Sequence, residues 1–118
     1  MEKVLIVDDS KFSRESIKKV LESLGHEVVG EAVDGLDGLR QYEESKATLV
    51  VTDIEMPNLD GVSMVKQLRQ KDADVRIIVV TSTVNAQVLQ EVTKQKASVV
   101  KKPIKEQRLL NAIKLLNR

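Results

Sequence analysis

Val4-Leu5-Ile6-Val7-Asp8-Asp9, residues 4–9, places an unbroken aliphatic run directly before two aspartates. The chain repeats this pattern at residues 49–52 before Asp53, 77–80 before Thr81, and 99–100 before Lys101-Lys102-Pro103. Short aliphatic runs without polar alternation are typical of strands in a parallel sheet, which is buried on both faces. Because the carboxyl ends of parallel strands lie along one edge, we expect these polar residues to converge. The pattern predicts an acidic pocket that also contains a hydroxyl and a lysine.

Helical patterns lie between the expected strands. The clearest begins after Ser10, a suitable N-cap, and stops at Gly25. Its apolar face has the i, i+3, i+4, i+7 spacing and consists of Ile17, Val20, Leu21 and Leu24. A second strand is expected at residues 27–32. The helix after it is weaker, because Gly35 and Gly38 reduce helix stability, and its apolar residues are Leu36, Leu39 and Tyr42.

The second half of the chain continues the alternation. Residues 56–61 are rich in turn formers, and helical spacing resumes at Val62, Val65 and Leu68 before a strand at 76–81. Residues 85–95 carry only a narrow apolar stripe, which predicts a helix attached shallowly to the rest of the fold. The final helix has a clean apolar side at Leu109, Leu110, Ile113 and Leu116.

Five successive βα units define the expected fold class. Right-handed crossovers with helices on both faces predict an α/β protein with a doubly wound five-stranded parallel sheet. We expect the strand order 2-1-3-4-5 that is known from flavodoxin-like folds, in one domain over residues 1–118. Ligands bind such sheets where the strand order reverses, outside the ends of the first and third strands. Those ends carry Asp8, Asp9 and Asp53.

Composition excludes several classes of protein. The chain has no cysteine, which rules out disulfides and thiolate metal sites. No apolar run approaches the ~18 residues of a membrane span, so a cytoplasmic protein is the simplest interpretation. The formal net charge of +1 gives no general reason to expect nucleic-acid binding.

Three converging carboxylates predict a cation site. Carboxylates about 5 Å apart repel by roughly 3 kcal/mol per pair at an effective dielectric of about 20. An all-oxygen site beside an open cleft suits Mg²⁺. Asp53 stands alone on the central strand and is the preferred nucleophile for a phosphoryl group, while the adjacent Asp8 and Asp9 suit the metal. Lys102 and the Thr81 hydroxyl could then contact phosphoryl oxygens.

Each of these residues also has a structural interpretation. Asp8 and Asp9 could complement the dipole of the first helix, Asp53 could make turn hydrogen bonds, and Lys102 could be surface charge. Their coincidence at corresponding strand ends favours a functional site.

With these motifs, the chain resembles the receiver domains of two-component response regulators, particularly the single-domain chemotaxis type. The resemblance covers essentially all 118 residues. Its motifs are residues 5–10, 53–61, Thr81-Ser82 and Lys102-Pro103, of which the second is highly specific.

The resemblance implies a mechanism and partners. Asp53 would accept a phosphoryl group from a sensor histidine kinase, and Asp8, Asp9, Asp53 and the backbone carbonyl of Glu55 would hold Mg²⁺. Thr81 would swing toward the phosphoryl group and Lys102 would pair with it. The change would reach a downstream protein through the fourth helix, last strand and last helix. Such a domain is not an enzyme beyond its own phosphorylation and dephosphorylation, and it needs neither membrane nor direct nucleic-acid contact.

The sequence departs from the family at Val99, where these receivers usually have an aromatic residue. We therefore expect signalling to rest on Thr81 and backbone shifts. The output region contains basic residues that form either a solvated face or a surface for an acidic partner: Lys94, Lys96, Lys101, Lys105, Arg108, Lys114 and Arg118.

Three alternatives stay open at this point. The chain could be the receiver part of a longer DNA-binding regulator, although the last helix ends the sequence and output through protein contacts is expected. It could be an inert receiver-like interaction module. It could also resemble haloacid-dehalogenase-like phosphatases, but these have a second aspartate where this chain has Glu55.

Overall fold

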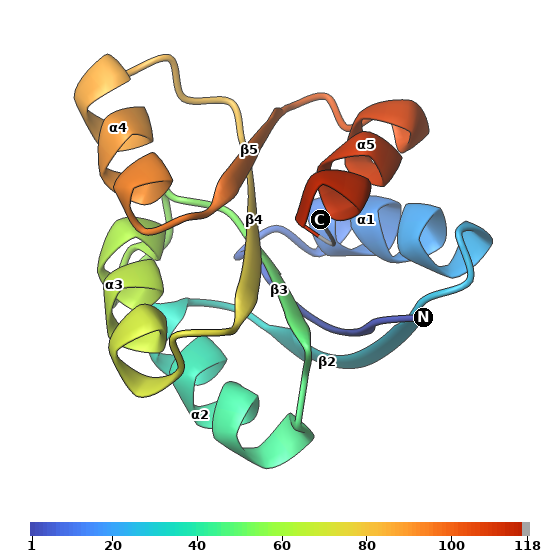
Figure 1. The fold of residues 1–118 in the computed structure, drawn as a ribbon, viewed down its shortest axis with the longest axis horizontal. Coiled ribbons are helices and arrows are strands. Elements are labelled where there is room, and N and C mark those ends of the chain that lie inside the picture. Colours follow the sequence, from blue (N-terminus) through green and yellow to red (C-terminus); the bar gives the residue numbers. More distant parts are fainter. Residues whose placement is uncertain (117–118) are drawn as a thin grey trace.

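Strands and helices alternate along the whole chain in the computed structural model, which describes residues 1–116 (Figure 1). The strands are β1 (Lys3–Val7), β2 (Glu27–Ala32), β3 (Leu49–Thr52), β4 (Arg76–Thr81) and β5 (Ser98–Lys101). The helices are α1 (Lys11–Ser23), α2 (Gly35–Ser45), α3 (Gly61–Lys71), α4 (Ala86–Lys94) and α5 (Glu106–Leu116). All strand pairs are parallel, in the order β2-β1-β3-β4-β5. The predicted fold class and strand order are confirmed.

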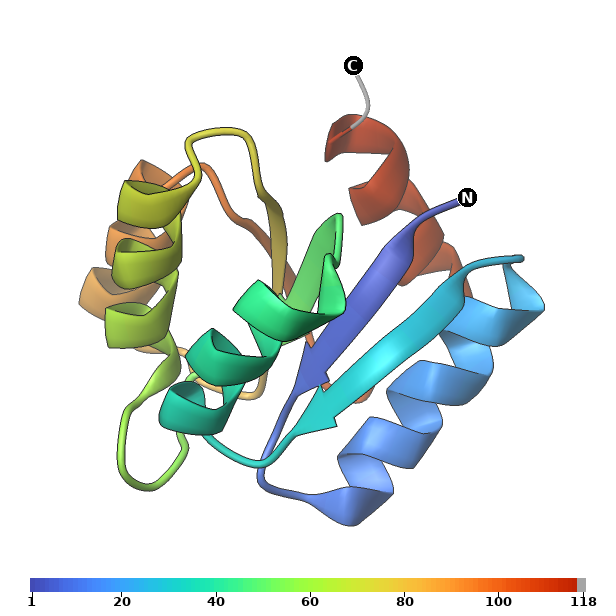
Figure 2. The ribbon, with the colours of Figure 1, turned by 90° about the horizontal axis from the view of Figure 1, so that it is seen from below.

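The sheet separates two hydrophobic cores. Helices α1 and α5 cover one face and α2, α3 and α4 cover the other (Figure 2). Successive residues of a strand point to opposite faces, so Val4 and Ile6 pack in the core with α1 and α5, whereas Leu5 and Val7 pack in the other core. This double burial explains why the central strands read as continuous aliphatic runs.

Side-chain caps fix where the helices begin. The Ser10 side chain accepts a hydrogen bond from the Ser13 amide, as predicted for the first helix. Asp34, Asp60 and Asn85 cap α2, α3 and α4 in the same way. Since these helices start after strands, their capped ends lie at the carboxyl edge of the sheet, where the predicted site also lies.

Helix α2 forms despite its two glycines, because Gly38 allows close packing. A Cβ atom at Gly38 would lie 2.7 Å from the Met64 sulfur of α3. Leu39 and Tyr42 pack against the core, as their spacing suggests. Leu36 does not, since 57% of its surface is exposed.

Helix α4 is attached shallowly, as predicted. Val92 is its only buried residue, and Val88 packs against the same core from a half-buried position. Polar contacts add to this attachment: Lys66 pairs with Glu91 at 3.2 Å, and Arg69 donates to the Gln95 carbonyl at 2.9 Å.

The described residues end before the last basic residue of the predicted set. Arg118, the last member of the predicted basic set, lies outside residues 1–116. Among the helices that residues 1–116 form, none combines the length and the apolar character that crossing a membrane requires.

Candidate functional site

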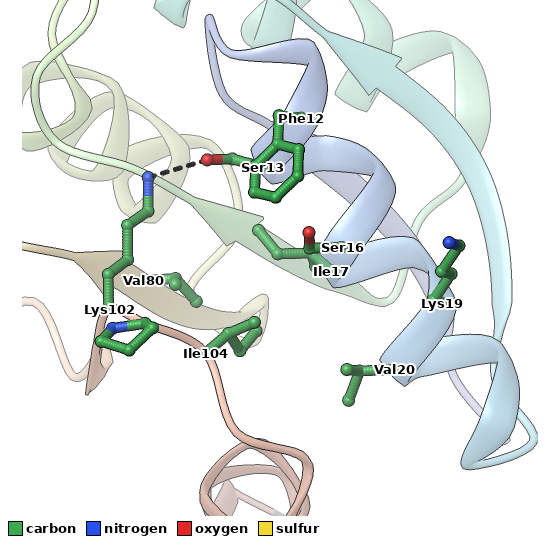
Figure 3. Close-up of a pocket in the computed structure, with 10 residues that line it drawn as sticks. Phe12, Ser13, Ser16, Ile17, Lys19, Val20, Val80, Lys102 and Ile104 are labelled. Carbon is green, nitrogen blue, oxygen red and sulfur yellow. Dashed lines mark hydrogen bonds between the residues drawn. The ribbon is translucent and has the colours of Figure 1, made fainter.

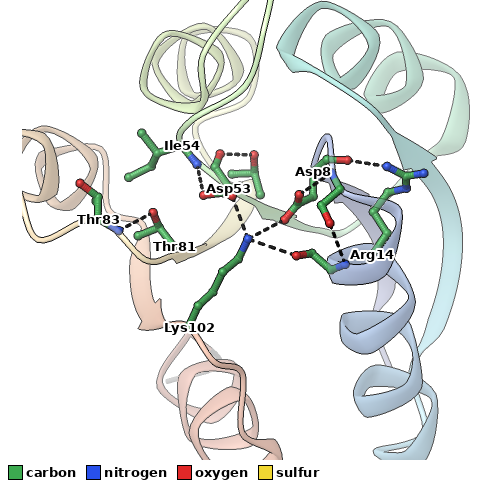
Figure 4. A network of polar contacts seen from close by, with 10 residues as sticks. Asp8, Arg14, Asp53, Ile54, Thr81, Thr83 and Lys102 are labelled. Carbon is green, nitrogen blue, oxygen red and sulfur yellow. Dashed lines mark hydrogen bonds and ion pairs between the residues drawn. The ribbon is translucent and has the colours of Figure 1, made fainter.

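Lys102 joins the ends of three strands at the carboxyl edge (Figure 4). Its Nζ lies 2.8 Å from Asp53 Oδ2 and 3.0 Å from Asp8 Oδ2. Asp8 and Asp53 follow the paired strands β1 and β3, whose last residues Val7 and Thr52 are in register, and Lys102 follows β5. The predicted convergence of these strand ends is therefore present.

Asp8 is a buried carboxylate with both oxygens engaged. Only 1% of the residue is exposed. Its Oδ1 accepts from the Ser10 amide at 2.9 Å, and Oδ2 accepts from Lys102. The Asp8 backbone carbonyl also accepts from Arg14 Nη1 at 2.7 Å, which ties α1 to the end of β1. The position of this carboxylate is thus set by two elements.

Asp53 is oriented but remains accessible. Its Oδ1 accepts from the Ile54 amide at 2.7 Å, and 13% of its side chain is exposed. Gly61 packs directly over the backbone here: its amide donates to the Ile54 carbonyl at 2.8 Å, and a Cβ atom would lie 2.1 Å from the Asp53 carbonyl oxygen. Glycine at the start of α3 is therefore required for the loop after the carboxylate to close.

The carboxylates of Asp8, Asp9 and Asp53 form a cluster that could hold a metal ion. One oxygen from each lies within 4.8 Å of the others. Asp8 is buried, Asp53 is half-buried and Asp9 is exposed, so the cluster opens to solvent on one side. Three carboxylates against the single ammonium of Lys102 leave excess negative charge, and this oxygen donor set fits a hard divalent cation.

The electrostatics keep Lys102 charged. Burial lowers the pKa of Lys102, but its hydrogen bonds to Asp53 and Asp8 and the charges of these carboxylates outweigh burial. The pKa of Lys102 consequently lies above its ordinary value of 10.5. At neutral pH this ammonium partly neutralises the cluster.

Thr81 lies beside this network rather than within it. It is the last residue of β4, is 1% exposed, and its hydroxyl accepts from the Thr83 amide at 3.1 Å. The Lys102 amide donates to the Thr81 backbone carbonyl at 2.9 Å, but among residues 1–116 no hydrogen bond joins the Thr81 hydroxyl to Asp53 or Lys102. The side chain of Glu55 is exposed, and its carbonyl as a metal ligand stays a prediction.

Sequence reasoning missed two residues of the site, Ser13 and Arg14. The Ser13 hydroxyl accepts from Lys102 Nζ at 3.3 Å, and Arg14 binds the Asp8 carbonyl while pairing with Glu31 at 3.3 Å. The available signal was the cap at Ser10, which places the first turn of α1 against the same edge of the sheet.

Comparison with known families gives the class of this fold and site. The family model of the response regulator receiver domain matches residues 4–114, and the chain belongs to this family. Within the family, the similar relatives include chemotaxis proteins. The chain is 38% identical over 117 residues to the chemotaxis protein CheY of Bacillus subtilis strain 168, covering 98% of each chain. It is 34% identical over 114 residues to the chemotaxis protein CheY of Listeria monocytogenes, covering 96% of each.

Solved structures agree on the fold. The CheX–CheY complex with BeF3 and Mg²⁺ from Borrelia burgdorferi aligns with a TM-score of 0.93 over 98% of this chain and 89% of that chain, at 24% identity. The isolated receiver domain of RcsB from Salmonella enterica serovar Typhimurium, solved with the phosphomimetic BeF3⁻, has a TM-score of 0.89 and 27% identity, covering 98% and 88%.

Membership of this family establishes the general function of the protein. The protein is a phosphorylation-activated receiver of two-component signalling and is homologous to CheY. Receiver domains take phosphoryl groups from histidine kinases and contact downstream targets. The inert-module and DNA-binding-regulator interpretations are not favoured.

Proposed function

We propose that Asp53 is the phosphoacceptor of this receiver and that Asp8, Asp9, Asp53 and the Glu55 backbone carbonyl hold Mg²⁺. The observation that supports this proposal most directly is the placement of Asp53. It is the accessible carboxylate that Lys102 contacts at 2.8 Å within a cluster of three acidic side chains. When bound, Mg²⁺ would neutralise negative charge on the carboxylates and on the incoming phosphoryl group.

Three side chains would have separate roles in phosphoryl transfer. A carboxylate oxygen of Asp53 forms a bond to phosphorus while the bond from phosphorus to the donor's histidine nitrogen breaks. Lys102 then pairs with a phosphoryl oxygen in place of the carboxylate charge lost at Asp53. The Thr81 hydroxyl leaves the Thr83 amide and donates to another phosphoryl oxygen. We infer that the domain catalyses only its own phosphorylation and the later hydrolysis of the acyl phosphate, in which water takes the phosphoryl group and the Asp53 carboxylate is restored.

We further propose that output passes through the face formed by α4, β5 and α5. Exposed basic residues gather here, among them Lys96, Lys101 and Arg108. Lys101, Arg108 and the 55% exposed Leu115 line a hollow of about 530 Å³ beside Val99. A protein partner with acidic side chains would complement this face. The similarity to CheY proteins supports a role in chemotaxis. The domain limits of 1–118 and the cytoplasmic location stay predictions.

Phosphoryl uptake from a small phosphodonor tests the role of Asp53. With Mg²⁺ present, the intact mass of the protein should rise by one phosphoryl group. Asp53→Asn should reduce uptake by roughly a hundredfold or more, because the nucleophile is removed. Asp60→Asn is the matched control, since asparagine also caps a helix and only a nearby charge is lost. Unchanged uptake by Asp53→Asn would contradict the assignment.

A further inference from the structure

The ammonium of Lys102 has a full set of acceptors, and one of them is not acidic. An ammonium carries three N–H groups, and here the acceptors are Asp53 Oδ2 at 2.8 Å, Asp8 Oδ2 at 3.0 Å and Ser13 Oγ at 3.3 Å. The bond to Ser13 joins the segment after β5 to α1 and is visible in Figure 3. The hydroxyl thus completes the coordination of this lysine.

Cation binding and phosphorylation at the proposed site would each change one of these three acceptors. Asp8 would turn its charge toward the cation, and Asp53 would lose its charge when the acyl phosphate forms. The Ser13 hydroxyl is altered by neither event. We propose that Ser13 is a positioning residue that keeps Lys102 Nζ at the site while its partner changes from carboxylate to phosphoryl oxygen. This inference rests on the proposed phosphoacceptor role of Asp53.

Lys102 needs such a contact because space is open beside it. A groove of about 520 Å³ between α1 and the segment after β5 is lined by Lys102, Ser13 and Phe12 (Figure 3). Phe12 is 79% exposed at its rim, so the groove is open to solvent. A lysine side chain is long and flexible, and without a fixed acceptor it can turn away from the site. Ser13 lies where the groove meets the carboxylates.

Ser13 is itself held firmly. Its amide donates to the capping side chain of Ser10 at 3.2 Å, and the next residue, Arg14, is bonded to the Asp8 carbonyl. Both contacts use groups other than the Ser13 hydroxyl. Ser13→Ala therefore removes the acceptor of Lys102 while the cap and the helix remain, and alanine is a good helix former.

The first test compares rates of phosphoryl uptake from a small phosphodonor with Mg²⁺. Ser13→Ala should slow uptake about three- to tenfold, the loss of one hydrogen bond to a charged group at long distance. Ser13→Thr keeps the hydroxyl and should stay within about twofold, because the groove has room for its methyl group. Ser16→Ala, which lines the same groove without contacting Lys102, should have no effect. If Ser13→Ala took up phosphoryl groups as fast as the wild type, the inference would be overturned and the role of Asp53 would stay intact.

A double-mutant cycle shows whether Ser13 acts through Lys102. In a Lys102→Met background, Ser13→Ala should cause no further slowing, whereas an equal slowing in both backgrounds would overturn the inference. The same cycle is measured by thermal unfolding in EDTA, where Ser13→Ala should lower the unfolding midpoint only when Lys102 is present. Absence of uptake in the wild type would overturn the proposed function, and absence of coupling in EDTA would refute the Ser13 contact itself.

Discussion

The two ends of the sheet carry ionic networks that differ in charge balance. At the carboxyl edge, Asp8, Asp9 and Asp53 face the single ammonium of Lys102. At the amino edge, the buried carboxylate of Glu2 pairs with Arg76 at 2.5 Å. The carboxyl-edge network has excess negative charge that an added cation would neutralise. At the amino edge, the carboxylate and the guanidinium neutralise each other.

Hydrogen bonds extend the network at the amino edge. Thr48 Oγ1 donates to Glu2 Oε1 at 2.8 Å and accepts from the Lys3 amide at 3.0 Å. The Glu2 amide donates to His26 Nδ1 at 2.9 Å, which joins β1 to the segment before β2. A network with balanced charges therefore holds strands together. A network with excess negative charge costs stability and creates a binding site.

Removing Lys102 should have the largest effect, because it takes the only cation from the carboxyl-edge network described here. Lys102→Met keeps the apolar stem but leaves the buried Asp8 and the half-buried Asp53 without their cation, at a cost of about 3 kcal/mol in the metal-free protein. Mg²⁺ should restore more stability in this variant than in the wild type. Urea unfolding in EDTA and in Mg²⁺ measures both effects. Lys101→Met, at the exposed neighbouring position, serves as the control, and an equal loss in both variants would argue against the network.

Removing the charge of Glu2 should destabilise the protein without affecting its chemistry. Glu2→Gln breaks the ion pair to Arg76 and should cost about 2 kcal/mol, while phosphoryl uptake at Asp53 stays unchanged. Glu27→Gln removes an exposed charge from the neighbouring strand as a control. Urea unfolding and uptake rates are measured on the same samples. A change in uptake would show that the two edges are coupled.

The sequence predicts which residues meet at the carboxyl edge far better than which residues meet at the amino edge. Asp8, Asp53 and Lys102 were identified because each directly follows a strand, and parallel strands bring such positions together whatever the details of packing. Glu2 and Arg76 carry no comparable signal. Their pairing depends on the exact register of β1, β3 and β4 and on two side-chain conformations, which strand patterns leave undetermined.

The same limit explains the errors and omissions at single residues. Ser13 reads as an ordinary helix residue, because its contact is with a lysine 89 positions away. Leu36 has the spacing of the apolar residues of α2 but is exposed, since it lies in the first turn beyond the edge of the core. Gly38 lowers local helix propensity, and only the approach of α2 to Met64 shows why it is there.

Tyr42 offers a smaller test at the amino edge. Its hydroxyl donates to Asp72 Oδ2 at 2.8 Å, and burial, followed by this bond, raises the pKa of Tyr42 to about 12. Tyr42→Phe should cost about 1 kcal/mol in urea unfolding at neutral pH. The neutral phenol favours folding below its ordinary pKa of 10.0, and this contribution is lost as the pH rises toward about 12. If Tyr42→Phe lost as much stability as the wild type between about pH 10 and 12, the assignment of this loss to Tyr42 would be contradicted.

The smallest expected effect concerns His26. Burial and then the positive N-terminus lower its pKa below 6.5, although Glu2 opposes this shift. Because the folded state binds the proton less well, His26 supports folding above about pH 6.5 and this support is lost as the pH falls below that value. His26→Gln, which can still accept from the Glu2 amide, should flatten the fall in thermal stability between about pH 7.5 and 5.5. Identical profiles for the two proteins would count against this contribution.

The strands differ in how much structure surrounds them. Residues 4–7 of β1 and all of β3 are buried, and each of these strands has a neighbour on both sides. Strand β5 is an edge strand in which Val100 is the one buried residue. The carboxylates therefore follow strands that are paired on both sides, whereas Lys102 follows a strand that pairs only with β4. A displacement of β5 would move Lys102 without requiring β1 or β3 to move.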